Sequence, residues 1–263
     1  MDKMEYLILG IIQGLTEFLP VSSSGHLVIA RSLIEDFQQP GLLFDISVHF
    51  ATFCAVLIYF RKKILLLVKS LLGAIFPRYR IIYYENKNML WGIVIASVPT
   101  ALIGLYFEKI ADILFSSTVY VGYALILTSI LLALSDKMKS SGSVTYNKSF
   151  VLGIVQGFAV IPGISRSGST IAIAVLLNIS RKEAAEFSFI MALPAVFGAT
   201  LLQAKYIGTL ENTLVTPYLI AMLSAFISGL LAIFIMMKLV RNAKLTYFAV
   251  YCLTIGIITI IWL

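Results

Sequence analysis

Long apolar segments are the feature that most limits what this 263-residue chain can fold into. Only 13% of its residues are charged, whereas soluble domains carry about a quarter. Six segments have the roughly 20 residues that a helix needs to cross a bilayer. They cover residues 42–60, 88–107, 116–135, 182–204, 216–238 and 245–263. The sequence therefore predicts an all-α polytopic membrane protein with six transmembrane helices.

Two further apolar regions are interrupted before they are long enough to span. Residues 4–19 would form a helix of only about 24 Å at 1.5 Å per residue. Pro20 separates this helix from a second short segment at residues 26–34. Residues 150–178 are interrupted in the same way by an internal Pro-Gly pair. We expect each region to form a re-entrant helical hairpin, which returns to the side of the membrane from which it entered.

The two interrupted regions are copies of each other. The segment "GIIQGLTEFLPVSSSGHL" (10–27) aligns without a gap on "GIVQGFAVIPGISRSGST" (153–170), at a constant offset of 143 residues. The identical pairs are Gly10/Gly153, Ile11/Ile154, Gln13/Gln156, Gly14/Gly157, Ser22/Ser165, Ser24/Ser167 and Gly25/Gly168. A re-entrant hairpin returns to the side that it entered, whereas three spans take the chain to the other side. The second hairpin therefore enters from the opposite face of the membrane. The chain is therefore predicted to be one membrane domain (1–263) built from inverted-topology repeats at about 1–135 and 144–263.

Lysine and arginine are distributed unevenly between the predicted loops. One side of the membrane would carry 15 of the 20 basic residues, and the other only Lys3, Arg31, Lys109 and Lys205. The positive-inside rule places the basic side in the cytoplasm, so both termini and the mouth of the first hairpin are predicted to face outward. Membrane orientation and anionic headgroups account for the net charge of +7, and no nucleic-acid partner is expected.

The hairpin tips are the predicted binding site. Irregular backbone at membrane depth is tolerated where it lines a polar cavity, and two inverted tips that meet near the midplane would form one. Each tip precedes a short helix, whose free N–H groups and positive dipole end favour an anion. The serines beside each tip can cap the helix or donate to a ligand. The sequence therefore predicts an anion site between the tips.

Arg166 is the only positive charge in either tip. An arginine at membrane depth costs about 2.5–3.5 kcal/mol on insertion scales, so it is expected to face a cavity or an opposite charge. Its planar guanidinium suits the oxygens of a phosphate. A buried ion pair with Glu17 is the structural alternative.

The first hairpin contains further candidates for chemistry. Gln13 and Glu17 share a helical face, where the carboxylate could hold a divalent cation or position a water. A protonated Glu17 bonded to a carbonyl is the alternative. His26 could transfer a proton or attack phosphorus, although a lone histidine is more often structural. Each serine is either a nucleophile or a partner of a backbone carbonyl in the preceding turn.

The residues outside the hairpins give weaker signals. Asp45, His49 and Thr52 share one face of the first full span, and this pattern fits a supporting role for the site as well as it fits packing. Residues 61–84 alternate basic and apolar positions, which is typical of a segment that lies along the membrane surface.

Both hairpin motifs resemble those of a known family. The stretch "QGLTEFLPVSSSGH" resembles the (E/Q)-x-x-x-E motif and the Ser-rich Gly-His that follows it in the undecaprenyl-diphosphate phosphatases, the bacitracin-resistance family. The stretch "PGISRSGST" resembles the P-G-x-S-R-S-x-x-T motif of the same family. Together with "FDISVHFAT", the similarity extends over the whole chain.

This resemblance implies hydrolysis of undecaprenyl diphosphate to the monophosphate at the outer face of the bacterial cytoplasmic membrane, which recycles the carrier lipid of cell-wall synthesis. It assigns catalysis to Glu17, Ser23, His26 and Arg166, and a magnesium or calcium ion to Glu17 and Gln13. With glutamine at position 13, Glu17 is the only carboxylate of that motif. The residues implied to bind substrate are Ser22, Ser24, Gly25, Gly163, Ser165, Ser167, Gly168 and Thr170.

Two other functions compete with this one. Inverted repeats with broken helices are also typical of secondary transporters, so the chain could flip a lipid phosphate instead. The type 2 phosphatidic acid phosphatases also carry S-G-H, but they require a histidine where this chain has Ala172. The sequence leaves open whether Ser23, His26 or water attacks, which polyprenyl length is preferred, and whether the protein forms a homodimer.

Overall fold

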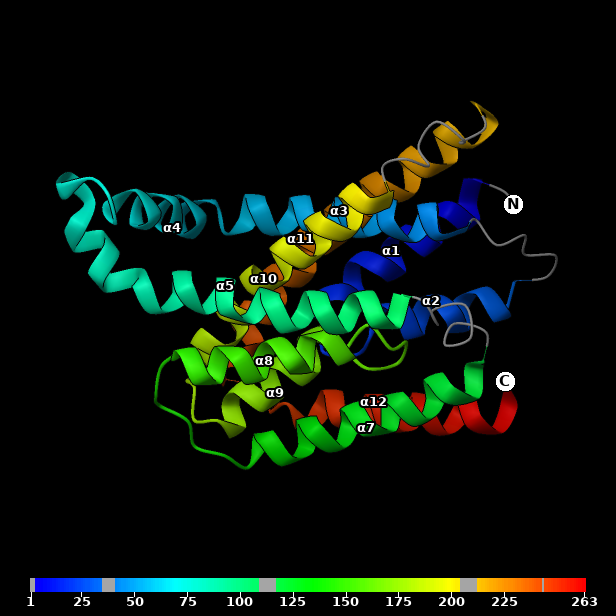
Figure 1. Cartoon of the computed structure of the whole chain (residues 1–263). Helices are drawn as coiled ribbons and strands as arrows, with labels where there is room; N and C mark the ends of the chain where they lie inside the picture. The colour runs from blue at the N-terminus through cyan, green and yellow to red at the C-terminus, as the bar shows by residue number, and fades with distance from the viewer. Residues whose placement is uncertain (1–2, 35–40, 109–116, 204–211, 243) are drawn as a thin grey trace.

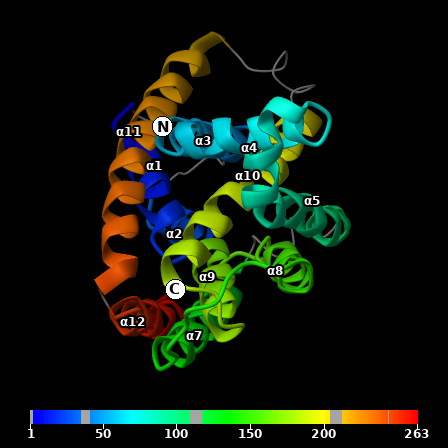
Figure 2. The same cartoon turned by 90° about the vertical axis from the view of Figure 1, so that its left-hand side faces the viewer.

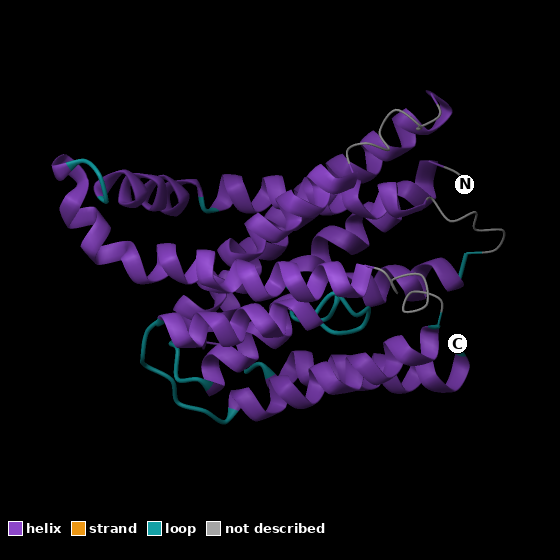
Figure 3. Ribbon diagram, in the orientation of Figure 1, coloured by secondary structure: helices purple, strands orange, loops and turns teal. Residues whose placement is uncertain are grey.

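The structure is a computed structural model and describes residues 3–34, 41–108, 117–203, 212–242 and 244–263 (Figure 1). Within these ranges the secondary structure is helical and contains no β-strand, which confirms the all-α prediction (Figure 3). The helices are α1 (Lys3–Phe18), α2 (Ser23–Ser32), α3 (Gly41–Tyr59), α4 (Arg61–Gly73), η1 (Pro77–Tyr79), α5 (Arg80–Glu108), α7 (Thr118–Asp136), α8 (Tyr146–Phe158), α9 (Arg166–Leu176), α10 (Arg181–Gln203), α11 (Asn212–Asn242) and α12 (Thr246–Trp262).

The described helices that are by themselves long and apolar enough to cross a membrane are a subset of the six predicted spans. By length and composition, α5, α7, α10 and α11 can each cross a membrane. Helix α3 qualifies only together with α4, from which it is bent by 78°. Helix α12 has 17 residues and rises only about 26 Å at 1.5 Å per residue. The described residues therefore form a multi-pass membrane protein in which four helices meet this criterion, or five if the bent pair counts as one span, and the six spans stay a prediction.

The two interrupted regions fold into the helix pairs α1/α2 and α8/α9. The predicted breaks are present, since α1 ends just before the turn at Pro20 and α8 ends before the turn at Gly163. Helix α1 begins and α2 ends on the side of the molecule where the chain ends lie, whereas α8 begins and α9 ends toward the opposite side (Figure 1). The two pairs therefore enter the molecule from opposite directions.

Glycines allow each pair to pack closely on a long helix from the other half of the chain. A Cβ atom on Gly10 of α1 would collide with the carbonyl oxygen of Ala221 on α11. A Cβ atom on Gly153, the equivalent residue of α8, would collide with the carbonyl oxygen of Ala96 on α5. Such close helix contacts are usual where small residues repeat every four positions in a membrane helix. The two halves are therefore interlocked.

The buried core also joins the two halves. Phe18 from the first hairpin packs edge-on against Phe189 of α10, with ring centroids 5.6 Å apart. Leu125, Ile171 and Ile233 belong to the same buried cluster and come from α7, α9 and α11. In Figure 2, α2 and α9 lie toward the middle of the molecule, with α11 and α12 on one side and α5 and α8 on the other. This packing holds the hairpin tips inside the protein.

Candidate functional site

The tips of the two hairpins contact each other. The Ser22 hydroxyl accepts a hydrogen bond from the backbone N–H of Gly163 at 3.1 Å, and Ser167 Oγ donates to the carbonyl of Leu19 at 3.2 Å. A Cβ atom on Gly25 would lie 3.0 Å from the Cα of Gly163. Ser22 (φ 72°) and Gly163 (φ 92°) both adopt the left-handed region, which is costly for a serine and marks a constrained chain reversal. The predicted meeting of the tips is therefore present.

The short helices α2 and α9 begin in the same way. Ser22 caps α2 and accepts from the backbone N–H three residues on at 3.3 Å. Ser165 caps α9 and accepts from the equivalent N–H at 3.0 Å. The first helical residues are then Ser23 in α2 and Arg166 in α9, which are related by the repeat offset. Two equivalent capped helix ends therefore present a hydroxyl in one hairpin and a guanidinium in the other.

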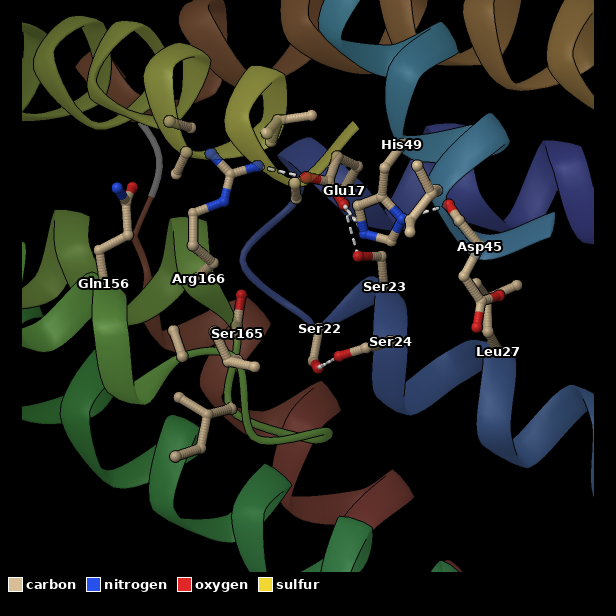
Figure 4. Close-up of a pocket in the computed structure, with 18 of the residues that line it drawn as sticks. Glu17, Ser22, Ser23, Ser24, Leu27, Asp45, His49, Gln156, Ser165 and Arg166 are labelled. Carbon is tan, nitrogen blue, oxygen red and sulfur yellow. Dashed lines mark hydrogen bonds and ion pairs between the residues drawn. The ribbon is translucent and has the colours of Figure 1, made fainter. Parts of the chain in front are cut away.

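The carboxylate of Glu17 joins these two groups. Its Oε1 forms an ion pair with Nη2 of Arg166. Its Oε2 accepts from Ser23 Oγ at 2.5 Å and from Gln13 Nε2 at 3.0 Å, and lies 3.5 Å from His49 Nε2. Glu17 lies between Arg166 and Ser23 in Figure 4. Only 6% of its side chain is exposed, so this carboxylate depends on protein donors in place of water.

Arg166 forms the buried ion pair with Glu17 that was the alternative to a phosphate-binding role. This pair occupies only one side of the guanidinium, because Nη1 is buried without a hydrogen-bond partner among the described residues. Arg166 also lines a pocket next to Glu17. It therefore keeps donors that can reach a phosphate oxygen.

The pocket has a volume of about 280 Å³ and lies between the two hairpins and helices α3, α5 and α10. Glu17 and Arg166 form one polar end. Its apolar wall includes Leu27, Ile46, Ile164, Ala192 and Val196. A mainly apolar pocket with a few polar groups at one end suits an amphiphile with a charged head.

The structure brings six of the predicted site residues to the pocket and leaves six others outside its lining. The lining residues are Glu17, Ser22, Ser23, Ser24, Ser165 and Arg166, whereas Gln13, Gly25, Gly163, Ser167, Gly168 and Thr170 lie outside this lining. The three glycines donate their N–H groups to the capping serines. Thr170 lies 2.5 Å from the Ser188 hydroxyl of α10. Most of these polar groups bond to other protein groups at the tips, although the Oε1 atom of Gln13 has no partner among the described residues. The predicted role of these six residues in ligand binding stays a prediction.

His26 lies outside the lining of the pocket. Its Nδ1 lies 2.8 Å from the carbonyl oxygen of Ser22, and its Nε2 lies 2.8 Å from the hydroxyl of Tyr251. The two rings stack with centroids 5.6 Å apart. His26 therefore faces α12 and supports the constrained turn at Ser22, and its role in proton transfer stays a prediction. A local sequence pattern could not reveal Tyr251 as its partner.

Four residues with charged, imidazole or amide side chains that were not assigned to the site also line the pocket. Asp45 and His49, two of the three candidates on one face of α3, reach it, whereas Thr52 donates to the carbonyl of His49 at 2.9 Å. Arg31 forms a bidentate ion pair with Asp45, with Nη1 to Oδ2 at 3.1 Å. Gln156 is the fourth. The sequence held a signal for both new residues, since Arg31 lies on the side poor in basic residues and Gln156 is identical to its repeat counterpart.

The donor atoms at the polar end limit how a metal ion could bind. The described part of the chain contains no group of three or more His, Cys, Asp and Glu side chains placed to hold a metal. Glu17 is a single carboxylate, and beside it the Oε1 atom of Gln13 is buried without a partner among the described residues. Magnesium is often held by one or two carboxylates together with substrate phosphates. These residues therefore fit a cation that a diphosphate helps to hold.

Comparison with known proteins gives similarity over nearly the whole chain. Residues 6–258 match the family model described as bacitracin resistance protein BacA. The chain is 38% identical over 269 residues to an undecaprenyl-diphosphatase of Christiangramia forsetii, covering 100% of this chain and 98% of the relative. It is 40% identical over 260 residues to an undecaprenyl-diphosphatase of Syntrophotalea carbinolica, covering 97% of each. A relative of the same name from Methanosphaera stadtmanae is 38% identical over 274 residues, covering 99% of this chain and 98% of the relative.

Proposed function

The chain belongs to the family of the bacitracin resistance protein BacA, and we propose that it hydrolyses undecaprenyl diphosphate to undecaprenyl phosphate and inorganic phosphate. One observation carries the proposal. The carboxylate of Glu17 contacts a hydroxyl from one hairpin and a guanidinium from the other, at the polar end of a mainly apolar pocket. A nucleophile (Ser23), a general base (Glu17) and a phosphate-binding guanidinium (Arg166) are thus in one place. The name undecaprenyl-diphosphatase, which its relatives share, supports the choice of substrate.

Arg166 binds the diphosphate in this proposal. The phosphate oxygens take the buried Nη1 and replace Glu17 at Nη2, because two parallel charge-assisted hydrogen bonds match the guanidinium. The N-terminal ends of α2 and α9 add the positive ends of two helix dipoles. The polyprenyl chain lies along the apolar wall of the pocket. Binding therefore releases Glu17 from its ion pair and leaves it beside Ser23.

Ser23 is the proposed nucleophile, since its hydroxyl is already bonded to the carboxylate. Glu17 accepts the proton of Ser23 Oγ while this oxygen bonds to the terminal phosphorus. The bond from that phosphorus to the bridging oxygen breaks, and undecaprenyl phosphate leaves with the proton. Glu17 then deprotonates a water that cleaves the phosphoserine, which releases inorganic phosphate and restores Ser23. Direct attack by water is the alternative.

A magnesium or calcium ion would be held by Glu17, by the Gln13 amide oxygen and by the oxygens of the diphosphate. When bound, such an ion neutralises negative charge on the phosphoryl group. Gln13 also donates to Glu17 Oε2, so it keeps the carboxylate oriented toward Ser23.

Purified protein in detergent should release phosphate from undecaprenyl diphosphate and not from undecaprenyl phosphate. Hydrolysis needs no second compartment, whereas transport does, so this assay separates a phosphatase from a lipid flippase built on the same repeat. A chelator should stop the release, and added magnesium should restore it. Folded protein that releases no phosphate under these conditions would contradict the proposed activity and favour transport.

We also propose that the chain crosses the bacterial cytoplasmic membrane as six spans and two re-entrant hairpins in an inverted repeat, with both termini and the pocket facing outward. Support comes from the uneven distribution of basic residues, although Lys109 and Lys205 lie outside the described residues. The start of α1 and the end of α12 lie on the same side of the molecule (Figure 1). The ion pair Arg31–Asp45 lines the pocket, and Arg31 lies on the predicted outer side of the membrane, so we propose that the pocket faces outward.

Cysteine labelling tests this orientation. Ser32, at the end of α2, and Ser141, between α7 and α8, are both exposed and are predicted to lie on opposite faces of the membrane. In a variant without Cys54 and Cys252, an impermeant maleimide should label S32C in intact spheroplasts and S141C only after permeabilisation. The reverse pattern would place the pocket on the cytoplasmic side.

A further inference from the structure

Gln156 carries a buried acceptor that the proposed chemistry does not use. The residue lines the pocket and is only 4% exposed, and its Oε1 has no hydrogen-bond partner among the described residues. Arg166 Nη1, a donor that belongs to the same pocket, is also unpartnered. Figure 4 shows Gln156 and Arg166 on the same side of Glu17, away from Asp45. One region of the pocket therefore holds a buried acceptor and a buried donor that have no partner within the described residues.

The neighbours of Gln156 determine which atom of its amide is available. Nε2 lies 3.3 Å from the carbonyl oxygen of Met191 and 3.4 Å from Thr100 Oγ1. The Met191 carbonyl can only accept, and the Thr100 hydroxyl donates its proton to the carbonyl of Ala96 at 2.8 Å or of Gly153 at 2.9 Å. Both neighbours are therefore acceptors, so the NH₂ group must face them. The oxygen of the amide is left for a ligand.

We infer that Gln156 Oε1 and Arg166 Nη1 form a subsite for a protonated phosphate group. The amide oxygen accepts from a P–OH group, while the guanidinium donates to a neighbouring P–O⁻ oxygen. A fully ionised phosphate oxygen can only accept, so an acceptor at this position favours a phosphate that still carries a proton. The inference rests on the proposed hydrolysis, whose product, the hydrogenphosphate dianion, has one such hydroxyl. Gln156 thus marks where inorganic phosphate is held.

Fluorophosphate provides a direct test. At mildly alkaline pH, hydrogenphosphate and fluorophosphate are both dianions of similar shape, but fluorine replaces the hydroxyl and cannot donate. Calorimetry on the full-length protein in detergent gives a dissociation constant for each. The unmodified protein should bind hydrogenphosphate about fivefold to tenfold more tightly, the value of one hydrogen bond. In Gln156→Met, which has a similar volume but no amide, the ratio should fall to about one.

Two further variants complete the test. Gln13→Met is the matched control, and all variants are measured with a chelator present so that the proposed metal-binding role of Gln13 does not affect the result. Gln13 is the repeat counterpart, and its Oε1 is also buried without a partner among the described residues, but it does not line the pocket, so the ratio should stay high. Gln156→Asn withdraws the amide oxygen and should lose the preference as Gln156→Met does. The ratio of two ligands measured on one variant does not depend on its folded fraction. An unchanged ratio in both Gln156 variants, or equal binding by the unmodified protein, would overturn the subsite.

The calorimetric readout also separates this inference from the proposed function. Binding of inorganic phosphate requires no turnover. If the protein prefers hydrogenphosphate through Gln156 but hydrolyses no lipid diphosphate, the subsite is supported and the proposed phosphatase activity is contradicted. If the protein hydrolyses the lipid diphosphate but binds the two anions equally, the phosphatase activity is supported and the subsite is contradicted.

Discussion

Replacement of Ser23 by alanine should reduce phosphate release from undecaprenyl diphosphate by about 10⁴-fold or more, as loss of a nucleophile does in other hydrolases. The Ser23 hydroxyl is 2.5 Å from the carboxylate that would deprotonate it, and it is the first residue of α2 at the polar end of the pocket. Removal of Oγ leaves the binding groups in place. Substrate affinity should therefore change little while kcat falls.

The decisive measurement is a covalent intermediate. Rapid mixing of the unmodified protein with substrate labelled on the terminal phosphate, followed by acid quench, should trap phosphoserine at Ser23. Ser24→Ala is the control, since Ser24 also lines the pocket but its hydroxyl lies 3.5 Å from Ser22 Oγ and is not bonded to Glu17. This variant should still form phosphoserine at Ser23, because the contact between Ser23 and Glu17 is left in place. Turnover retained in Ser23→Ala would exclude the serine and leave water, activated by Glu17, as the attacking group.

Substitution of Arg166 by lysine should lower kcat/KM by about 10²–10³-fold, the usual effect of losing one preorganised donor to the transition state. Lysine keeps the charge that balances the buried Glu17, so the fold should survive. Its ammonium group is a point charge and cannot span two phosphate oxygens while also facing the carboxylate. Alanine is a poorer choice, because an unpaired buried carboxylate costs about 3–5 kcal/mol and would destabilise the protein.

Arg31→Lys is the matched control for this prediction. Arg31 lines the same pocket and forms its own ion pair with Asp45, whereas Glu17 is paired with Arg166. Its replacement by lysine should change kcat/KM much less than Arg166→Lys. Thermal unfolding of both variants shows whether the fold is intact. Arg166→Lys with activity close to that of the unmodified protein would remove Arg166 from the phosphate-binding role.

Much of the fold could be predicted because the signals are local or repeated. Apolar length predicted the helices, and the proline and glycine breaks predicted the turns that end α1 and α8. The number of spans was less predictable. Residues 42–60 read as a complete span, but α3 qualifies only with α4, at a 78° bend that the apolar run does not reveal. Residues 245–263 are apolar throughout, yet α12 begins at Thr246 and has only 17 residues.

For the site, the amino-acid pattern was sufficient to identify the two hairpins and the residues at their tips, including Ser23, Glu17 and Arg166. It could not show that one carboxylate contacts both of the others, nor that His26 turns away to Tyr251, 225 positions further along the chain. It also gave no role to Gln156. Those outcomes depend on how α5, α10 and α12 pack around the tips. Side-chain partners so distant in sequence are set by that packing and leave no periodic trace in either segment.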